Sequence, residues 1–275
     1  MEGNIEYLYH YTNIETLALI LKHHTFRFSS LDKMDDLQEQ ETGDIKNVGQ
    51  FCYISSWTDD ETENIPMWNM YTSIASGIRI RLRKMPFKVY ENTPADLQEV
   101  TNTPVTDSSG GNYLKSIIPI ADMFRKGYIC PAAMSQDILF KVEYTAERDK
   151  LYPKLLTTNG DRFTIALGEM GKYKNTHWAF QKEWRYILIF LPLNLNQPVE
   201  KSSSDAQIMG NKILHGLEKQ PFPFFDMVLD DEAYSDMEIT LSPQISAGNR
   251  LIVESLIEKY NPRATIKDSS LVGLI

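Results

Sequence analysis

Four short segments of the chain each combine aromatic residues with polar side chains that could take part in chemistry. They contain His10, the pair Ser55 and Ser56, Trp68 with Tyr71, and Gln181 with Glu183. A carboxylate held at the head of an apolar strand, as Glu183 is in EWRYILIFL, can stabilise positive charge that develops on a sugar. An aromatic face such as that of Tyr71 or Trp68 suits a flat cation. These residue types suit electrostatic stabilisation of a group that carries positive charge.

Several common chemistries have no support in the sequence. The five histidines form no HExxH motif and no zinc-ligand spacing, and Cys52 and Cys130 are too few for a disulfide scaffold or a four-thiolate zinc site. A GxSxG motif is absent, and so are a GxGxxG motif after a strand and a GxxxxGK[ST] loop. The sequence therefore predicts no metal site, no covalent serine or cysteine hydrolase, no Rossmann cofactor site and no P-loop.

Hydrophobic periodicity predicts the elements that must position these residues. Residues 5–11 alternate as a strand, and Thr12 or Asn13 is expected to cap a helix that begins at Ile14. Further strands are expected at 25–29, 51–55, 78–83, 139–144 and 184–191, and helices at 66–73 and 164–172. The C-terminal part predicts a strand at 237–241, a helix at 247–259 and a strand at 264–267. The fold class is therefore α+β, with strands scattered among helices.

The remaining segments are expected to lie at the surface. The acidic run from Asp32 to Asp44 is too charged for a core and is expected to face solvent, and residues 201–205 are expected to form a loop. The polar stretch 91–112 reads as a loop insertion, and residues 206–275 as a C-terminal extension of one domain that spans 1–275.

Strand 78–83 places Arg79, Arg81 and Arg83 on one face. Such a row either protects a solvated or edge strand or binds phosphates, and the sequence leaves both readings open.

Composition limits the partners of the chain. With 28 Lys and Arg against 37 Asp and Glu, its 275 residues carry a formal charge of −9, which disfavours binding to nucleic acid or membrane through bulk charge. No apolar block suits a membrane span or a signal peptide. A cytoplasmic protein without a membrane partner is therefore expected.

The order of these motifs resembles an uncharacterised bacterial family. The likeness is carried by His10-Tyr11-Thr12, Ser55-Ser56-Trp57, Met67-Trp68-Asn69-Met70-Tyr71 with Gly77, and Trp178 to Arg185, and more loosely by Leu241-Ser242-Pro243. The chain departs from the family at residues 34–39, where MDDLQE replaces the usual NDP.E, and at Gln181, where a glutamate is usual. The family in turn resembles the ADP-ribosyltransferase superfamily of the His-Tyr-Glu type.

That resemblance implies a split mixed or antiparallel sheet with flanking helices, and transfer of ADP-ribose from NAD to RNA, DNA or protein. His10 would hold the nicotinamide-side ribose, Tyr71 would stack on nicotinamide, and Glu183 would be the catalytic carboxylate. Residues expected to contact NAD are His10, Tyr11, Thr12, Ser55, Ser56, Trp68 and Tyr71, with a phosphate role open for Arg79, Arg81 and Arg83. The resemblance also implies that Gln181 orients the acceptor, since the transferases often carry a Gln or Glu with this role two residues before the catalytic Glu. On a strand, this spacing of two would place Gln181 and Glu183 on one face. A toxin or phage-defence role with a neutralising antitoxin is also implied, without a metal.

Other interpretations stay open at this point. Water could be the acceptor, which would make the chain an NAD glycohydrolase, or the fold could serve as a non-catalytic binding module. His10 could be an ordinary hydrogen-bonded strand histidine, and Glu183 could be one half of an ion pair with Lys182 or Arg185.

Overall fold

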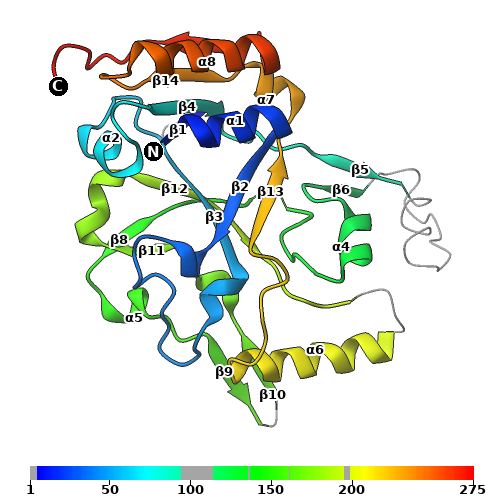
Figure 1. The fold of residues 1–275 in the computed structure, drawn as a ribbon. Coiled ribbons are helices and arrows are strands. Elements are labelled where there is room, and N and C mark those ends of the chain that lie inside the picture. Colours follow the sequence, from blue (N-terminus) through cyan, green and yellow to red (C-terminus); the bar gives the residue numbers. More distant parts are fainter. Residues whose placement is uncertain (1–4, 94–113, 136, 161, 195–198) are drawn as a thin grey trace.

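The centre of the molecule is one mixed β-sheet, seen here in a computed structural model that describes residues 5–93, 114–135, 137–160, 162–194 and 199–275 (Figure 1). Nine strands of the described residues form it. They are β1 (Tyr7–Asn13), β2 (Thr25–Ser30), β3 (Cys52–Thr58), β4 (Gly77–Arg83), β7 (Leu139–Lys141), β12 (Glu183–Ile189), β13 (Phe224–Val228), β14 (Glu238–Leu241) and β15 (Thr265–Lys267). The order is β13-β2-β3-β1-β4-β14-β15, with β12 paired to β3 and β7 to β12. The predicted α+β class is confirmed.

The chain opens with the predicted strand, cap and helix. Asn13 ends β1, and its side chain accepts a hydrogen bond of 2.8 Å from the backbone N–H of Thr16, which caps α1 (Ile14–His23). The helix ends at His24, whose left-handed backbone returns its N–H to the carbonyl of Ile20. The apolar stripe of α1 packs into the main core, so this opening unit fixes β1 against the rest of the sheet.

The sheet forks at β3. β12 runs antiparallel to the whole of β3 along one edge, so β1 and β2 must share the other edge. β2 pairs there with Tyr53 and Ile54, whereas β1 pairs with Thr58. The backbone around Ser56 therefore lies where β1 and β2 diverge, and we call this place the fork.

The C-terminal residues complete both sides of the sheet. β13 pairs with β2, while β14 pairs with β4 and runs parallel to β15. Helix α8 (Ala247–Tyr260) connects β14 to β15 and lies along them at the top of Figure 1, beside α1. This βαβ unit confirms the predicted order of elements at the end of the chain. Residues 206–275 are thus an integral part of the sheet.

Smaller elements surround this sheet. Paired strands are β5 (Tyr90–Asn92) with β6 (Leu114–Ser116), β8 (Glu143–Thr145) with β11 (Tyr173–Asn175), and β9 (Leu156–Asn159) with β10 (Arg162–Ile165). The other helices are α2 (Ile65–Tyr71), α4 (Ile120–Lys126), α5 (Arg148–Leu151), α6 (Val199–Leu214) and α7 (Asp231–Ser235). Four 3-10 turns are η1 (Leu31–Lys33), η2 (Val48–Phe51), η3 (Leu167–Glu169) and η4 (Thr176–Gln181). Most of the insertion predicted at 91–112 lies outside the described residues, which leave out 94–113. Within the described part, no helix is long and apolar enough to cross a membrane.

Three local predictions differ from the structure. A helix was expected at 164–172, but residues 162–165 form β10 against β9, and only a 3-10 turn follows. Gly168 and Gly171 weaken any helix there, and Gly171 adopts a φ of 78° that a helix cannot contain. A loop was expected at 201–205, but these residues belong to α6. Serine and aspartate disfavour a helix interior only weakly, and α6 is long enough to include them. Strand 139–144 is also divided into β7 and β8.

Burial within α1 gives a direct test of the fold. Leu17 is 0 % exposed and lies in the main core, whereas Leu19 on the opposite side of the helix is 51 % exposed. Leu17→Ala should lower the free energy of unfolding by about 2–5 kcal/mol because it leaves a cavity. Leu19→Ala should change it by less than about 0.5 kcal/mol. Urea denaturation of both variants measures the difference, and equal losses would contradict this packing.

Candidate functional site

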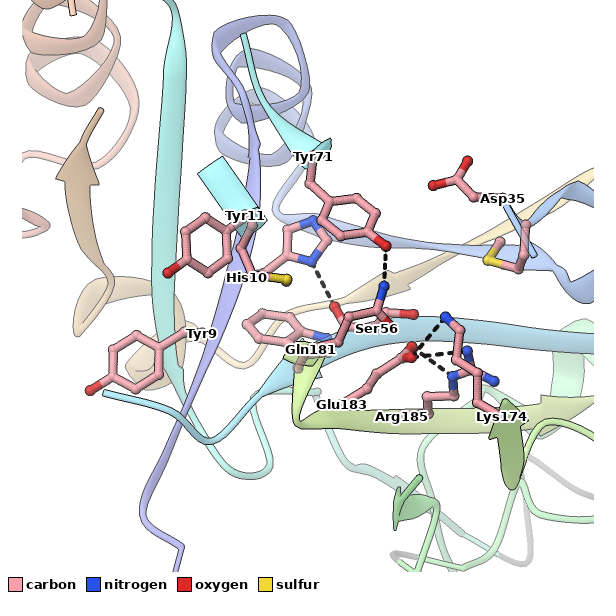
Figure 2. Close-up of a pocket in the computed structure, with 13 residues that line it drawn as sticks. Tyr9, His10, Tyr11, Asp35, Ser56, Tyr71, Lys174, Gln181, Glu183 and Arg185 are labelled. Carbon is pink, nitrogen blue, oxygen red and sulfur yellow. Dashed lines mark hydrogen bonds and ion pairs between the residues drawn. The ribbon is translucent and has the colours of Figure 1, made fainter. Parts of the chain in front are cut away.

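The candidate site is a cavity of about 540 Å³ at the fork (Figure 2). Its walls come from β1, β3, α2, β11, η4 and β12, and from the segment that follows β2. His10, Tyr71 and Glu183, which are far apart in the sequence, all line it. The other lining residues are Tyr9, Tyr11, Met34, Asp35, Ser56, Trp57, Met67, Lys174, Gln181 and Arg185.

Three of the residues expected to contact NAD do not reach the cavity. Thr12 is buried outside its lining. Ser55 points the other way from Ser56 on β3, and its hydroxyl accepts a hydrogen bond of 2.9 Å from Trp57 Nε1. Trp68 is 0 % exposed and donates its Nε1–H to Glu63 at 3.0 Å. Trp68 packs edge-on against Tyr11, so it supports a cavity wall and presents no face to a ligand.

The arginines of β4 also lie outside the cavity lining. Arg79 stacks over Tyr9 and donates to the carbonyl of Glu61 at 2.9 Å. Arg81 stacks over Tyr7 and lies 3.8 Å from the Glu238 carboxylate. Arg83 pairs with Glu232 at 2.9 Å. Each guanidinium thus has partners within the protein, which favours the reading of this row as strand support over phosphate binding.

Two carboxylates and two cations, whose charges sum to zero, meet at the wall of the cavity. We call these four side chains the charge cluster: Glu39, Lys174, Glu183 and Arg185. Arg185 Nε lies 2.7 Å from one Glu183 oxygen, and Lys174 Nζ lies 3.2 Å from the other. Glu39 contacts the same two cations, at 3.0 Å from Lys174 and at closer range from Arg185. All four side chains are buried. The predicted ion pair of Glu183 with Arg185 is present, whereas Lys182 pairs with Asp60 instead.

Glu39 overturns the expectation that residues 32–44 face solvent. Glu39 and Asp36 are buried, and Asp44 accepts hydrogen bonds from the backbone N–H groups of Leu155 and Leu156. Glu39 and Asp44 are therefore partners for cations and backbone donors in other elements, whereas Glu41 is exposed. Asp35 remains exposed and lines the mouth of the cavity.

The charge cluster keeps the Glu183 carboxylate ionised. Burial raises the pKa of this carboxyl, but the neighbouring Arg185 and Lys174 outweigh burial and lower it to about 2. The backbone N–H of Glu183 donates to the Tyr144 hydroxyl at 2.8 Å, and Arg185 donates to the carbonyl of Gly171 at 3.0 Å. These bonds fix the carboxylate at the first residue of β12.

At the fork, the backbone carbonyl of Ser56 accepts a hydrogen bond from His10. Its Nδ1 lies 2.8 Å from the carbonyl oxygen of Ser56, and because a carbonyl only accepts, Nδ1 must carry the proton. Burial lowers the pKa of His10 to about 4, so the ring is neutral at pH 7 and Nε2 is a hydrogen-bond acceptor. His10 also lines a second cavity of about 980 Å³, between α1, β2 and β13, which includes Arg27.

Gln181 was expected to share a strand face with Glu183, and that placement is wrong. Gln181 ends η4, Lys182 adopts a left-handed backbone, and β12 begins only at Glu183. The Gln181 side chain is 3 % exposed and donates from Nε2 to the Tyr71 hydroxyl. Such burial does not suit contact with a macromolecular acceptor, so we do not keep that role.

Sequence reasoning missed three parts of the site. Glu39 lies far along the chain from Lys174 and Arg185, and Lys174 and Glu183 are 9 residues apart on different elements, so neither Lys174 nor Glu39 carried a local signal. Asp35 was counted only as one member of an acidic run. Arg185 lies in the EWR segment, where its spacing of two from Glu183 was the available signal.

No protein-family model, curated protein or solved structure matches this chain. The resemblance drawn from the motifs therefore remains an expectation. Among the residues that the structure describes, no three histidine, cysteine, aspartate or glutamate side chains are placed to hold a metal ion.

The charge cluster predicts a specific loss of stability. Glu39→Gln should lower the free energy of unfolding by about 3–5 kcal/mol, because it removes one partner from buried cations. Glu41→Gln, an exposed change in the same segment, should stay within about 0.5 kcal/mol of the wild type. Guanidinium denaturation at pH 7 provides the comparison. A Glu39→Gln protein as stable as the Glu41→Gln protein would show that the charge cluster does not form.

The environment of His10 predicts its titration. In the folded protein the imidazole should stay neutral as the pH falls through 6.5 and become half protonated near pH 4. In the unfolded chain the same group should titrate near about 6.5. The unfolded state thus binds this proton first, so His10 should reduce stability progressively as the pH falls from about 6.5 towards 4. NMR titration of the ring protons measures the pKa, and a folded value of 6.5 or higher would contradict burial beside Ser56.

Proposed function

We propose that the protein transfers ADP-ribose from NAD to a macromolecule. The observation that carries this proposal is the meeting of His10, Tyr71 and an ionised Glu183 in one cavity. These are the three residue types that the sequence motifs suggested for NAD chemistry. The forked sheet around them supports the further proposal that the fold is the split sheet of the ADP-ribosyltransferases.

Glu183 suits electrostatic stabilisation better than proton transfer. Nicotinamide leaves with the electron pair of the C1′–N bond and becomes neutral, so it needs no general acid. As that bond breaks, positive charge develops on the ribose, and a fixed carboxylate stabilises it. A carboxylate with a pKa of about 2 is a weak base at pH 7, so the proton of the attacking acceptor group passes to water. The new bond joins C1′ to the acceptor.

His10 suits recognition of a sugar. Its neutral Nε2 can accept a hydrogen bond from a ribose hydroxyl, and the Ser56 carbonyl holds the ring in that tautomer. In this proposal nicotinamide lies beside Tyr71, in the cavity that His10 shares with Glu183. Binding of a polar ligand in this cavity is also supported by Gln181 Oε1, a buried acceptor on the cavity wall that receives no hydrogen bond from the described residues.

Labelled NAD tests the proposal. The protein is incubated with NAD labelled in the adenosine part and a whole-cell extract, and the products are digested separately with nuclease and protease. Label released by one digestion identifies the acceptor as nucleic acid or protein. Free ADP-ribose without a labelled macromolecule would instead favour NAD glycohydrolysis. NAD that remains intact would overturn the proposal and leave a binding module as the alternative.

Substitution of Glu183 should separate catalysis from folding. Glu183→Gln should reduce transfer by about 10²-fold or more, because it removes the charge that stabilises the transition state. Glu39→Gln is the matched control, since it disturbs the charge cluster but lies outside the cavity lining. Thermal unfolding first shows whether the Glu39→Gln protein is folded. The folded variant should then lose much less transfer activity than Glu183→Gln. Equal losses in the two folded variants would assign Glu183 a structural role.

A further inference from the structure

The pair formed by Gln181 and Tyr71 has hydrogen-bonding groups that the protein does not use. Gln181 Nε2 donates to the Tyr71 oxygen, which leaves the hydroxyl proton of Tyr71 free to be donated. Burial, and then the nearby Glu183 charge, raises the pKa of Tyr71, so this proton is retained at pH 7. Gln181 Oε1 is buried and accepts no hydrogen bond from the described residues. The pair therefore presents one donor and one acceptor on the wall of the cavity.

The position of this pair is fixed by its surroundings. Tyr71 is the last residue of α2, and Gln181 is the last residue of η4. Asn64 caps α2 through a bond of 3.2 Å from the N–H of Met67, and its Nδ2 donates to the carbonyl of Phe180 at 3.1 Å. The Asn64–Phe180 bond and the Gln181–Tyr71 bond thus hold the two ends of α2 against η4. Figure 2 shows the Gln181 side chain directed at the Tyr71 hydroxyl across the cavity wall.

An unpartnered buried carbonyl is costly, and native structures seldom leave one. A ligand group that accepts from Tyr71 and donates to Gln181 would satisfy both residues. A primary carboxamide carries both groups on one carbon, because its carbonyl oxygen accepts a hydrogen bond and its N–H₂ donates one. The rings of Tyr11 and Trp57 on the same cavity suit a flat aromatic body that bears such a group.

We propose that Gln181 and Tyr71 recognise the primary carboxamide of the ligand, with the Tyr71 hydroxyl donating to its carbonyl and its N–H donating to Gln181 Oε1. This inference rests on the proposed function in one respect, which is that the carboxamide belongs to the nicotinamide of NAD. It changes the expected contact of Tyr71 with nicotinamide from its ring face to its hydroxyl. It also gives Gln181 a role in binding the donor substrate.

Two matched probes test this inference with the purified full chain. Nicotinamide and 3-acetylpyridine share the ring and the carbonyl, but the second carries a methyl group in place of the N–H₂. Calorimetry should show that the wild type binds nicotinamide at least about tenfold more tightly, because only nicotinamide satisfies Gln181 Oε1. Equal affinities, or no binding of either probe, would overturn the inference without any variant.

Three variants then test which residue causes the preference for nicotinamide. In Gln181→Met the ratio of the two affinities should fall to about one. In Tyr71→Phe both probes should weaken by a similar factor, because the shared carbonyl loses its donor. His177→Gln, an exposed change on η4, should keep the wild-type ratio. Thermal unfolding checks each variant, and a folded Gln181→Met protein that keeps the tenfold preference would contradict the assignment.

Parallel assay of NAD cleavage separates this inference from the proposed function. A carboxamide preference that depends on Gln181, found without NAD cleavage, would support the inference and overturn the proposed function. NAD cleavage by a protein with no carboxamide preference would overturn the inference and keep the proposed function.

Discussion

The charge cluster of Glu39, Lys174, Glu183 and Arg185 is the constraint on which the site depends. A single buried ion costs several kcal/mol of desolvation, so none of these four groups is stable there without the others. Together they carry no net charge, and they tie the segment after β2 to β11 and β12. The arrangement leaves one ionised carboxylate, that of Glu183, on the cavity wall at the head of β12. A carboxylate fixed in this way is preorganised for charge that develops on a neighbouring sugar.

The cavity beside the charge cluster opens at the fork in the sheet. Because β1 and β2 meet β3 at different points, the Ser56 carbonyl is available to His10, and the cavity opens between their strands. The opposite wall, α2, is held by contacts from distant parts of the chain. Glu63, just before α2, accepts hydrogen bonds from the backbone N–H and the hydroxyl of Ser270, at 2.6 and 2.8 Å. The C-terminal residues thus stabilise the helix that ends at Tyr71.

Local sequence patterns predicted most strands of the central sheet and the meeting of His10, Tyr71 and Glu183 in one cavity, but not the partners that hold these side chains. The helix spacing after Asn13 and the apolar run after Glu183 each determine one element with little help from elsewhere, so α1 and β12 were predictable. Lys174 and Glu39 were not, because a contact between segments more than 100 residues apart leaves no periodicity in either. The acidic run was assigned to solvent since its charge is visible in the sequence and its buried cations are not. Gln181 was placed on a strand because its spacing from Glu183 is the same whether or not a left-handed residue such as Lys182 intervenes.

The central claim is that Glu183 faces the nicotinamide-side ribose of bound NAD. A crystal structure of the wild-type protein with a carbocyclic NAD analogue, which cannot lose nicotinamide, tests it most directly. The account predicts that a hydroxyl of the ring that replaces this ribose lies within about 3.5 Å of a Glu183 carboxylate oxygen, in the cavity at the fork. An analogue bound elsewhere on the molecule, or a cavity that stays empty at saturating analogue, would contradict the claim.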